Sequence, residues 1–414
     1  MTSRADVIAD AVITQFNKLP NKRKPAIRDN GLHEWVPLSG IVAEKDGTFT
    51  CVALATGMKC LPASRLPEAN GNGIHDWHAE ILAIRTFNRF LLDECKALSQ
   101  GKAGTGSGML VSCDSTPKAS GSVARPPFYV KEGIKLHMYC SEAPCGDASM
   151  ELIMAAQDDA SPWPAPDRPS SPNAGGSDAT LPGRAYFSQL GIVRRKPARG
   201  DAPPTLSKSC SDKLALKQCT SLLSSLAALL IDPAGAYIDT IVLPASQYSS
   251  TACERAFAAA GRMGAVTARE DWSDGYAFRP FVVETTTREF GFSRRAVQAR
   301  AEGISPSNVA AAWALSGVEE SILGGVVQGK RPFDPRGASR MSRRQMWVLA
   351  RDVAGQLRGS DNIRHSLDGK SYHEVKHGPL LAARRAAKAA TRSTALAGWV
   401  VNDGDSDFGA DVET

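Results

Sequence analysis

The sequence lacks any apolar run long enough to cross a membrane. A transmembrane helix needs roughly 20 consecutive apolar residues, and no segment of the 414-residue chain approaches that length. The first residues, Met1 to Asp6, also lack the apolar core of a signal peptide. We therefore expect an intracellular protein, in the cytoplasm, the nucleus or both, with no membrane partner.

The cysteine content does not indicate a disulfide framework. The nine cysteines are an odd number scattered from Cys51 to Cys253, whereas disulfide-rich domains are short and carry even sets of cysteines. Most of them are expected to be small buried apolar residues.

The net charge of the chain is not extreme either, because 49 Lys and Arg against 43 Asp and Glu give a net charge of +6. This balance permits an RNA partner without requiring one.

What the sequence does contain is a histidine and a carboxylate two positions apart at the start of a helical pattern. His78-Ala-Glu80 precedes apolar residues at helical spacing from Ile81 to Leu91. In zinc hydrolases of the nucleoside-deaminase kind, the His of such a pair holds Zn²⁺ and the Glu, which is not a ligand, transfers protons. An isolated His-x-Glu is usually a solvated surface pair, so the interpretation depends on a second motif.

That second motif is Pro144-Cys145. The usual signature is H-x-E followed by P-C-x-x-C, but the third residue after Cys145 is Ala148, which cannot bind a metal. Catalytic zinc normally keeps three protein ligands and one open position, so a third ligand must come from elsewhere in the chain. Any remaining cysteine qualifies on residue type. The best-placed candidate is Cys210, which stands just before another apolar helical pattern.

Three short motifs occur in the order His78-Ala-Glu80, Pro144-Cys-Gly-Asp-Ala-Ser149 and Ser209-Cys-Ser-Asp-Lys213. Together they resemble the deaminase domain shared by the adenosine deaminases that act on RNA and the tRNA-specific adenosine deaminases. Shorter matches run from Glu34-Trp35 to Gly398-Trp399. The resemblance therefore covers nearly the whole chain.

The resemblance implies a role for each motif. His78, Cys145 and Cys210 are expected to hold Zn²⁺, and Glu80 is expected to carry protons. A zinc ion there would lower the pKa of a water at its fourth position toward roughly 7. This would allow hydrolysis of adenosine to inosine at neutral pH.

The resemblance also implies a second cofactor. In that family an inositol hexakisphosphate is buried in the core beside the active site, held by Lys, Arg, Trp and Tyr side chains. Matched motif by motif, the expected contacts are Arg85, Ser207, Lys213, Lys330, Tyr372, Lys376, Lys388 and Trp399. Asp76 and Lys213 are expected to link the polyanion to the metal site through hydrogen bonds. Several cations can be buried together only when an anion neutralises them.

The chain departs from the family pattern at several positions. After the third motif the editing enzymes have an Arg and a Trp that touch the phosphates, whereas this chain has Leu216 and Lys217. Lys217 could partly substitute, and Leu216 cannot. His75 stands where the editing enzymes have Asn. The segment from Tyr372 to Trp399 needs a gap to align, and its basic residues from Arg384 to Lys388 fit an exposed helix face equally well.

The residue pattern predicts an α/β fold, and the resemblance implies a cytidine-deaminase-like core in which helices flank a mixed β-sheet. A helix is predicted at residues 5–16, and Asp46-Gly47 between two β-rich runs predicts an antiparallel hairpin. Further strands are predicted at 108–113, 135–140, 237–243, 276–286 and 318–327, and further helices after His78 and at 215–231, 341–357 and 376–396. A C-terminal extension of helices and strands is expected to enclose the polyanion.

We expect one deaminase domain over residues 1–414. Residues 157–183 are dominated by Pro, Ser and Gly, so they can bury little and are predicted to be a disordered insertion. Residues 403–414 are predicted to be a flexible acidic tail. The N-terminal helix begins so early that no separate RNA-binding module is expected before it.

The resemblance implies a zinc-dependent enzyme that converts adenosine to inosine in tRNA, and we expect its target to be position 37, beside the anticodon of alanine tRNA. A base must leave its stack to reach a buried metal, which costs less in a loop than in a duplex. Three basic clusters, Lys22–Lys24, Arg194–Lys196 and Arg340–Arg344, fit either contacts to tRNA phosphates or solvated surface. No DNA partner is expected. The alternatives are an editor of duplex RNA and a non-catalytic scaffold that binds RNA or inositol phosphate; the presence of Glu80 argues against the scaffold.

Overall fold

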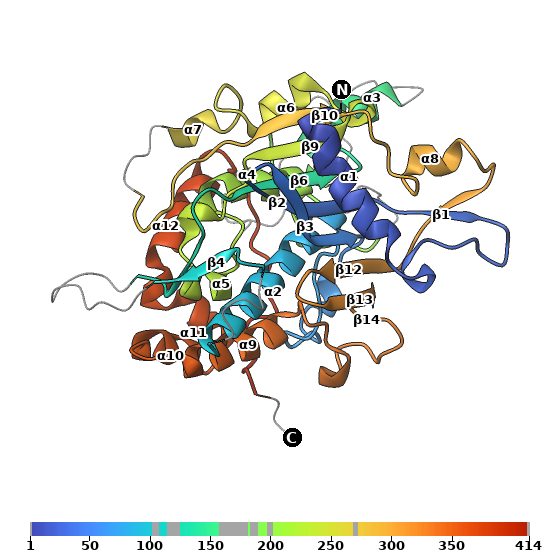
Figure 1. Cartoon of the computed structure of the whole chain (residues 1–414). Coiled ribbons are helices and arrows are strands. Elements are labelled where there is room, and N and C mark those ends of the chain that lie inside the picture. The colour runs from blue at the N-terminus through green and yellow to red at the C-terminus, as the bar shows by residue number, and fades with distance from the viewer. Residues whose placement is uncertain are drawn as a thin grey trace, which may run out of the picture.

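The computed structural model describes most of the chain (Figure 1). The described residues are 2–101, 107–113, 125–156, 181–182, 189–196, 202–267 and 272–411. The insertion predicted at 157–183 lies outside them except for Leu181–Pro182, so its disorder stays a prediction. Among the described helices, none combines the length and the apolar character that crossing a bilayer requires.

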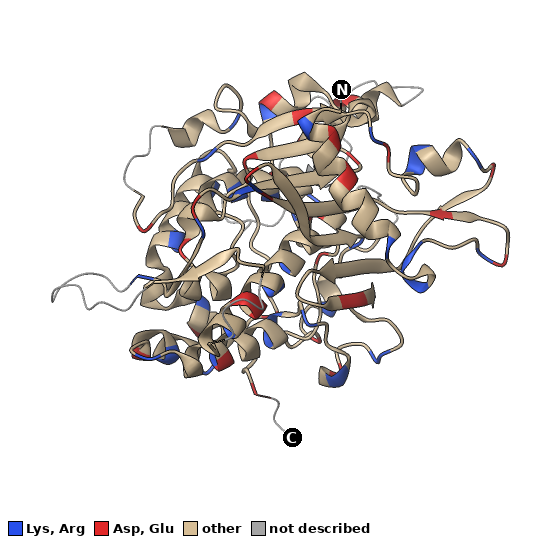
Figure 2. Ribbon diagram, viewed as in Figure 1, with Lys and Arg blue, Asp and Glu red and all other residues tan. Residues whose placement is uncertain are grey.

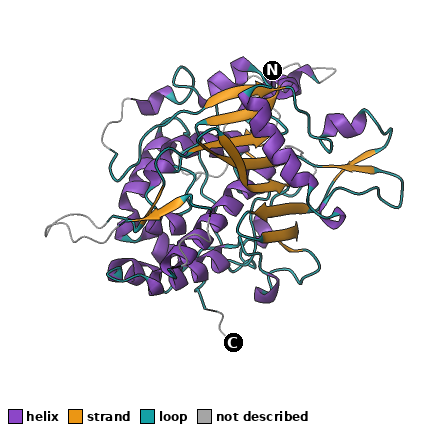
Figure 3. Cartoon of the chain, viewed as in Figure 1, coloured by secondary structure: helices purple, strands orange, loops and turns teal. Residues whose placement is uncertain are grey.

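A mixed sheet of eight strands forms the centre of the molecule, in the order β10-β9-β6-β2-β3-β12-β13-β14 (Figure 3). The strands are β2 (Leu38–Lys45), β3 (Thr48–Thr56), β6 (Lys135–Cys140), β9 (Thr240–Pro244), β10 (Val282–Thr286), β12 (Ala310–Ala314), β13 (Val318–Leu323) and β14 (Val326–Val327). The neighbours β6, β9 and β10 run parallel, and the other pairs are antiparallel. The predicted α/β class with a mixed sheet flanked by helices is confirmed.

Helices cover both faces of this sheet. The helices of the described residues are α1 (Arg4–Asn17), α2 (Ala79–Ser99), α3 (Met150–Ala155), α4 (Cys210–Thr220), α5 (Ser225–Leu230), α6 (Ser250–Phe257), α7 (Gly264–Thr267), α8 (Arg294–Gln298), α9 (Arg343–Gln356), α10 (Asp361–Leu367), α11 (Tyr372–His377) and α12 (Ala382–Ser393). Within β3, Leu54 packs in the apolar cluster of α1, whereas Val52 and Ala55 pack in the cluster of α2. Helix α1 lies so close to β2 that a Cβ on Gly40 would be 2.5 Å from Val12 Cγ1.

The hairpin predicted at Asp46-Gly47 is present and positions the region of His78. The turn residues have φ angles of 49° and 75°, as a two-residue type I′ turn requires. The strands pair from the turn to their open end at Thr56. Beyond that end the carbonyl of Gly57 accepts the N–H of Ala79 at 2.8 Å, which ties the start of α2 to the sheet.

Two helices that were predicted as continuous are interrupted. The run 215–231 is wrong as one helix, because Ser221 has a φ of 55° and a left-handed residue ends a helix. The run 376–396 divides at Gly378-Pro379, since proline lacks the N–H that a continuing helix needs. Helix α4 also begins at Cys210 itself, so this cysteine lies in a first helical turn.

Other differences concern strands outside the central sheet. The strand predicted at 108–113 is present as β4 (Leu110–Ser112), but it pairs only with β5 (Phe128–Val130) in a separate two-stranded sheet. Two more small sheets join β1 (His33–Trp35) to β11 (Ile304–Pro306) and β7 (Leu181–Pro182) to β8 (Arg194–Arg195). Periodicity could not separate these short pairs from loops.

The acidic tail, which was expected to be flexible, packs against the body of the protein as far as the structure describes it. Asp405, Phe408 and Ala410 are buried. The ring of Phe408 stacks on that of Tyr372 with centroids 5.2 Å apart. The burial of these residues therefore holds the acidic segment against the protein despite its negative charge.

Candidate active site

His78 and Glu80 lie at the start of α2, where the motif placed them. His78 is the N-cap residue, and its backbone N–H donates to Oδ1 of Asp76 at 3.0 Å. Glu80 is in the first turn and only 6% exposed. Burial raises the pKa of Glu80 above its ordinary value, so this carboxyl holds a proton more readily than an exposed glutamate does.

Cys145 lies beyond β6, in the turn that leads to α3. The next residue, Gly146, has a φ of 101°, and a Cβ there would lie 2.3 Å from Oγ of Ser209, so the position requires glycine. This close approach brings the two cysteine segments together. The N–H of Ser211 donates to the carbonyl of Cys145 at 3.0 Å, and the N–H of Cys210 donates to Sγ of Cys145 at 3.4 Å.

A ring nitrogen of His78 and the sulfurs of Cys145 and Cys210 form one cluster. One ligand atom from each lies within 4.8 Å of the others, and Sγ of Cys145 is 3.8 Å from Nδ1 of His78. Tetrahedral zinc with bonds of about 2.3 Å to sulfur and about 2.0 Å to nitrogen separates its ligand atoms by about 3.5 to 3.8 Å. The donor types and their spacing fit zinc, and three protein ligands leave a fourth position open.

The charges of this cluster also fit a cation. Burial and Lys196 would lower the pKa of His78, but the Cys145 thiolate raises it to about 10. A hydrogen bond from Cys210 holds the pKa of Cys145 well below that of an ordinary thiol, whereas burial raises the pKa of Cys210. The three donors therefore attract positive charge, which a bound metal ion would supply.

A second grouping of possible ligands, Cys60, Asp76 and His78, also lies within 4.8 Å. Its carboxylate is already engaged, because Oδ2 of Asp76 accepts from Lys196 at 2.8 Å and from Lys213. Burial would raise the pKa of Asp76, but the two ammonium groups hold it well below its ordinary value. This grouping is therefore the weaker candidate for a metal.

Lys196 belongs to a basic cluster for which the sequence predicted contacts to tRNA phosphates or solvated surface, but the structure places it in the site. Its Nζ lies 2.8 Å from Oδ2 of Asp76 and 3.3 Å from Sγ of Cys210, and the residue is 5% exposed. Burial would lower the pKa of Lys196, but Asp76 and Cys210 raise it well above the ordinary value. The ammonium therefore fixes Cys210 from the side facing Asp76. The signal in the sequence was the cluster Arg194–Lys196, which could equally have been surface.

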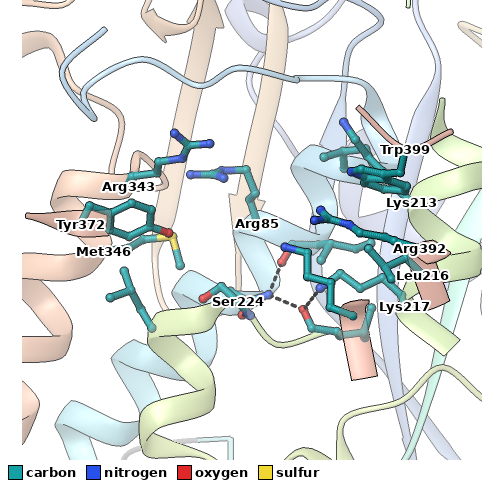
Figure 4. A pocket seen from close by; sticks show the side chains of 16 residues that line it. Arg85, Lys213, Leu216, Lys217, Ser224, Arg343, Met346, Tyr372, Arg392 and Trp399 are labelled. Atoms are coloured by element: carbon teal, nitrogen blue, oxygen red, sulfur yellow. Dashed lines mark hydrogen bonds between the residues drawn. The ribbon is translucent and has the colours of Figure 1, made fainter. Parts of the chain in front are cut away.

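A cavity of about 220 Å³ lies between α2, α4, α9 and α12 (Figure 4). Five predicted polyanion contacts line it: Arg85, Lys213, Tyr372, Lys388 and Trp399. Lys217, which was weighed as a partial substitute, also lines it, as do Arg343 and Arg392, which were not predicted. Lys213 connects the cavity with the metal cluster, because its Nζ also bonds to Asp76 and to Oγ of Ser207.

The remaining predicted contacts lie outside the lining of this cavity. Ser207 donates to Oδ2 of Asp76 at 2.8 Å. Both residues also bond to Nζ of Lys213, so they connect to the cavity through this lysine. Nζ of Lys376 lies 5.7 Å from the ring centre of Tyr372, at the margin of the cavity. Lys330 is exposed in a turn after β14 and is not among the residues that line the cavity, so its role as a contact stays a prediction.

The charge of the cavity is strongly one-sided. No Asp or Glu is among the described residues that line it. Burial lowers the pKa of Lys217 and Lys388 well below the ordinary value, and that of Arg85 and Arg392 to about 10. Nε of Arg392 is a buried donor with no partner among the described residues. Buried cations without an anion are unfavourable, so the cavity fits a polyanion that would neutralise them.

The sequence is similar to curated proteins over nearly its full length. The family model described as the adenosine-deaminase (editase) domain matches residues 53–403. The tRNA-specific adenosine deaminase 1 of Schizosaccharomyces pombe is 34% identical over 97% of this chain and 95% of that protein. The proteins of the same name from Saccharomyces cerevisiae and Drosophila melanogaster are 35% and 30% identical, over 57% and 50% of this chain and 58% and 47% of theirs.

Proposed function

The chain belongs to the adenosine-deaminase (editase) domain family, and on that premise we propose that it is a zinc enzyme that converts adenosine to inosine in tRNA. The proposed target is position 37, beside the anticodon of alanine tRNA. The observation that carries the chemistry is the convergence of His78, Cys145 and Cys210, which are 67 and 65 residues apart in sequence, next to the buried Glu80. The full-length similarity to a relative named for tRNA supports the substrate class.

In the proposed reaction each residue of the site has a separate role. Zn²⁺ held by His78, Cys145 and Cys210 would supply the Lewis acid that activates water. Glu80 takes a proton from the attacking water and gives it to N1 of adenine, and it later protonates the departing N6 amine. Water adds to C6 and ammonia leaves, so one water is consumed for each inosine formed. Lys196 keeps the Cys210 sulfur oriented toward the cluster throughout.

We propose further that the cavity beside the metal cluster holds an inositol hexakisphosphate. Arg85, Lys213, Lys217, Lys388 and Arg392 converge on it without a carboxylate in its described lining. A compact polyanion would remove the cost of burying these cations. It would also hold Lys213 in place, and Lys213 in turn bonds to Asp76.

The function is tested by incubating the purified, zinc-loaded protein with an alanine tRNA transcript and sequencing the product, where inosine reads as guanosine. Conversion at position 37 is expected, with loss of activity after chelation. Conversion elsewhere in the tRNA would move the site but keep the enzyme class. Faster turnover of long duplex RNA than of tRNA would contradict the proposed substrate.

The bound groups are tested on the native protein by metal analysis and by mass spectrometry of the acid extract. About one zinc and one inositol hexakisphosphate for each chain are expected. A Cys210→Ser variant is expected to lose zinc, while Cys253→Ser, a buried cysteine far from the cluster in sequence, should keep it. Equal zinc content in both variants would refute the ligand assignment.

A further inference from the structure

A small substructure stands apart from the central sheet at one side of the molecule (Figure 1). It consists of residues 22–36 and 288–308, and we refer to it as the rim module. Its strands β1 and β11 pair in parallel through three residues each, and α8 packs against β1. The N–H of Val36 donates to the carbonyl of Phe292 at 2.9 Å and that of Ser307 to the carbonyl of Trp35 at 2.9 Å. The module is therefore one packed unit rather than two loose loops.

The rim module is attached on one side next to Cys145. Arg295 donates to Oε2 of Glu142 at 2.8 Å and to the carbonyl of Ser141 at 3.2 Å. Glu142 also accepts a backbone hydrogen bond from Arg294. Since Glu142 is three residues before Cys145, the first turn of α8 lies against the segment that carries a proposed metal ligand.

On its other side the module is attached next to His78. Asn308 accepts a hydrogen bond from Nζ of Lys59, and the carbonyl of Lys59 accepts the N–H of Trp77 at 3.0 Å. Trp77 immediately precedes His78. The rim module therefore borders the segments of the metal cluster from two directions.

The module carries most of the excess positive charge of the chain. It contains eight Lys and Arg against four Asp and Glu, a net charge of +4 out of the +6 of the whole sequence. Several of these cations are used within the fold, since Arg28 pairs with Glu34 and Arg295 with Glu142. Figure 2 shows basic residues on α8, at the outer side of the molecule.

Two arginines of the module are exposed and held in place without a carboxylate partner. The guanidinium of Arg294 lies 5.9 Å from the ring centre of Trp35, and that of Arg300 lies 5.5 Å from that of Phe292. Neither arginine forms an ion pair within the part of the chain that the structure describes, and both are exposed. A guanidinium against an aromatic face is oriented and partly desolvated, which prepares it for an anion from solution.

We infer that the rim module is a docking surface for the phosphate backbone of the RNA substrate, with Arg294 and Arg300 as phosphate contacts. The inference rests on the proposed tRNA substrate. Arginine matches phosphate geometry through its planar set of donors, and backbone contacts position a nucleic acid without reading its sequence. The attachment next to Cys145 and His78 would fix the distance between the bound backbone and the reacting base.

The test compares tRNA binding by the wild-type protein and by the double variant Arg294→Glu, Arg300→Glu. The dissociation constant for a fluorescent alanine tRNA transcript is measured by anisotropy at several salt concentrations. We expect the dissociation constant to rise at least tenfold. The slope of log K against log salt should become shallower by about 1.4 to 1.8, as the loss of two phosphate contacts predicts.

Two control variants separate a local contact from general charge and from misfolding. Arg358→Glu with Lys370→Glu makes the same change of charge at exposed positions near α10, far from α8 in Figure 1. Arg294→Lys with Arg300→Lys keeps the charge of the module. The distant control should bind tRNA within threefold of the wild type, and the Lys variant, which keeps the charge but loses the planar donors, should bind more tightly than the Glu variant.

A rise of tenfold or more in the Glu variant, with no comparable rise in the distant control, supports the docking surface. A smaller rise, an equal rise in the distant control, or a wild-type protein that does not bind tRNA overturns it, and a surface for an acidic protein would then be the alternative. If the wild type binds tRNA but does not deaminate it, the proposed function fails while the binding comparison still decides the docking surface.

Discussion

At the residue scale, Glu80 is the group whose loss should separate chemistry from metal binding. A Glu80→Gln variant keeps the size of the buried side chain but cannot carry a proton. Its kcat should therefore fall about 10²- to 10⁴-fold, while its zinc content stays that of the wild type because Glu80 is not a ligand. Ammonia release and metal analysis on the same preparation measure both quantities. A variant with a rate within tenfold of the wild type would show that another group moves the proton.

Lys196 is the residue that joins the carboxylate of Asp76 to the sulfur of Cys210. A Lys196→Met variant leaves the Asp76 carboxylate buried with one fewer cation, which should cost about 3 to 5 kcal/mol of unfolding free energy. It should also weaken zinc retention during dialysis against a chelator. Lys135→Met, on the exposed start of β6, should change neither quantity. Full stability and zinc retention in the Lys196 variant would contradict the bridging role.

The candidate site could be predicted from the sequence only where its residues sit in short motifs. His78, Glu80 and Cys145 have fixed neighbours, so residue type and spacing identify them. Lys196 and Arg392 reach the site because the fold brings separate segments together, and neither has a local pattern that distinguishes it from a surface cation. A motif match is also not sufficient by itself. Lys330 matches a motif of the family, but its side chain does not line the cavity.

At the element scale, periodicity predicted the long elements and missed the breaks. The hairpin around Asp46-Gly47 and helix α2 have strong signals in the form of a turn dipeptide and a long apolar stripe. The interruption at Ser221 has no such signal, because serine adopts a positive φ only under tertiary constraint. The sequence does contain a helix-breaking dipeptide, Gly378-Pro379. The apolar residues on either side of it keep helical spacing, so periodicity alone predicted one continuous helix.

The C-terminal segment after Asn402 is the element whose role differs most from expectation. Both carboxylate oxygens of Asp405 are used, Oδ1 by the N–H of Gly71 and Oδ2 by Nε2 of His75, each at 2.6 Å. Nδ2 of Asn402 donates to the other ring nitrogen of His75 at 3.3 Å. Burial lowers the pKa of His75 to about 4, in keeping with a neutral ring that donates at Nε2. The segment therefore fastens the loop that leads to Asp76 and His78.

An Asp405→Ala variant should consequently lose stability and metal together. Removal of this buried acceptor leaves the N–H of Gly71 and Nε2 of His75 without a hydrogen-bond partner, at a cost of about 1 to 3 kcal/mol for each buried donor. The exposed neighbour Asp407 provides the matched control, since Asp407→Ala should be within about 0.5 kcal/mol of the wild type. Chemical denaturation measures the unfolding free energy of both variants. Equal midpoints for the two variants would indicate that the segment is only loosely attached.

At the scale of the whole molecule, the metal cluster and the basic cavity are two parts of one charge system. Asp76 lies between them, and it accepts from Lys196 on the side of Cys210 and from Lys213 on the side of the cavity. Anything that changes the charge balance of the cavity should therefore change the position of Lys213 and, through Asp76, the loop of His78. If the proposed polyanion occupies the cavity, its loss should therefore disturb the residues around the metal cluster.

This coupling predicts a pH dependence of stability that reverses with the polyanion. In the polyanion-free protein, burial lowers the pKa of Lys376 from 10.5 to about 8 and lowers the pKa of Lys388 well below its ordinary value. The folded chain then binds fewer protons than the unfolded chain between about pH 8 and pH 10.5, so the unfolding free energy should rise with pH across that window. The expected rise from Lys376 alone is about 3 kcal/mol, because one pKa unit corresponds to about 1.4 kcal/mol.

With inositol hexakisphosphate bound, the ammonium forms of these lysines are favoured, and stability should instead stay level or fall as the pH rises through the same window. Unfolding curves recorded at intervals from pH 7 to pH 10, with and without the added polyanion, measure both trends. A Lys376→Met variant should lose part of the rise seen in the polyanion-free protein, because one depressed ammonium is gone. Parallel pH profiles with and without the polyanion would mean that the cavity does not bind it, and the one-sided charge of the cavity would then need another counterion.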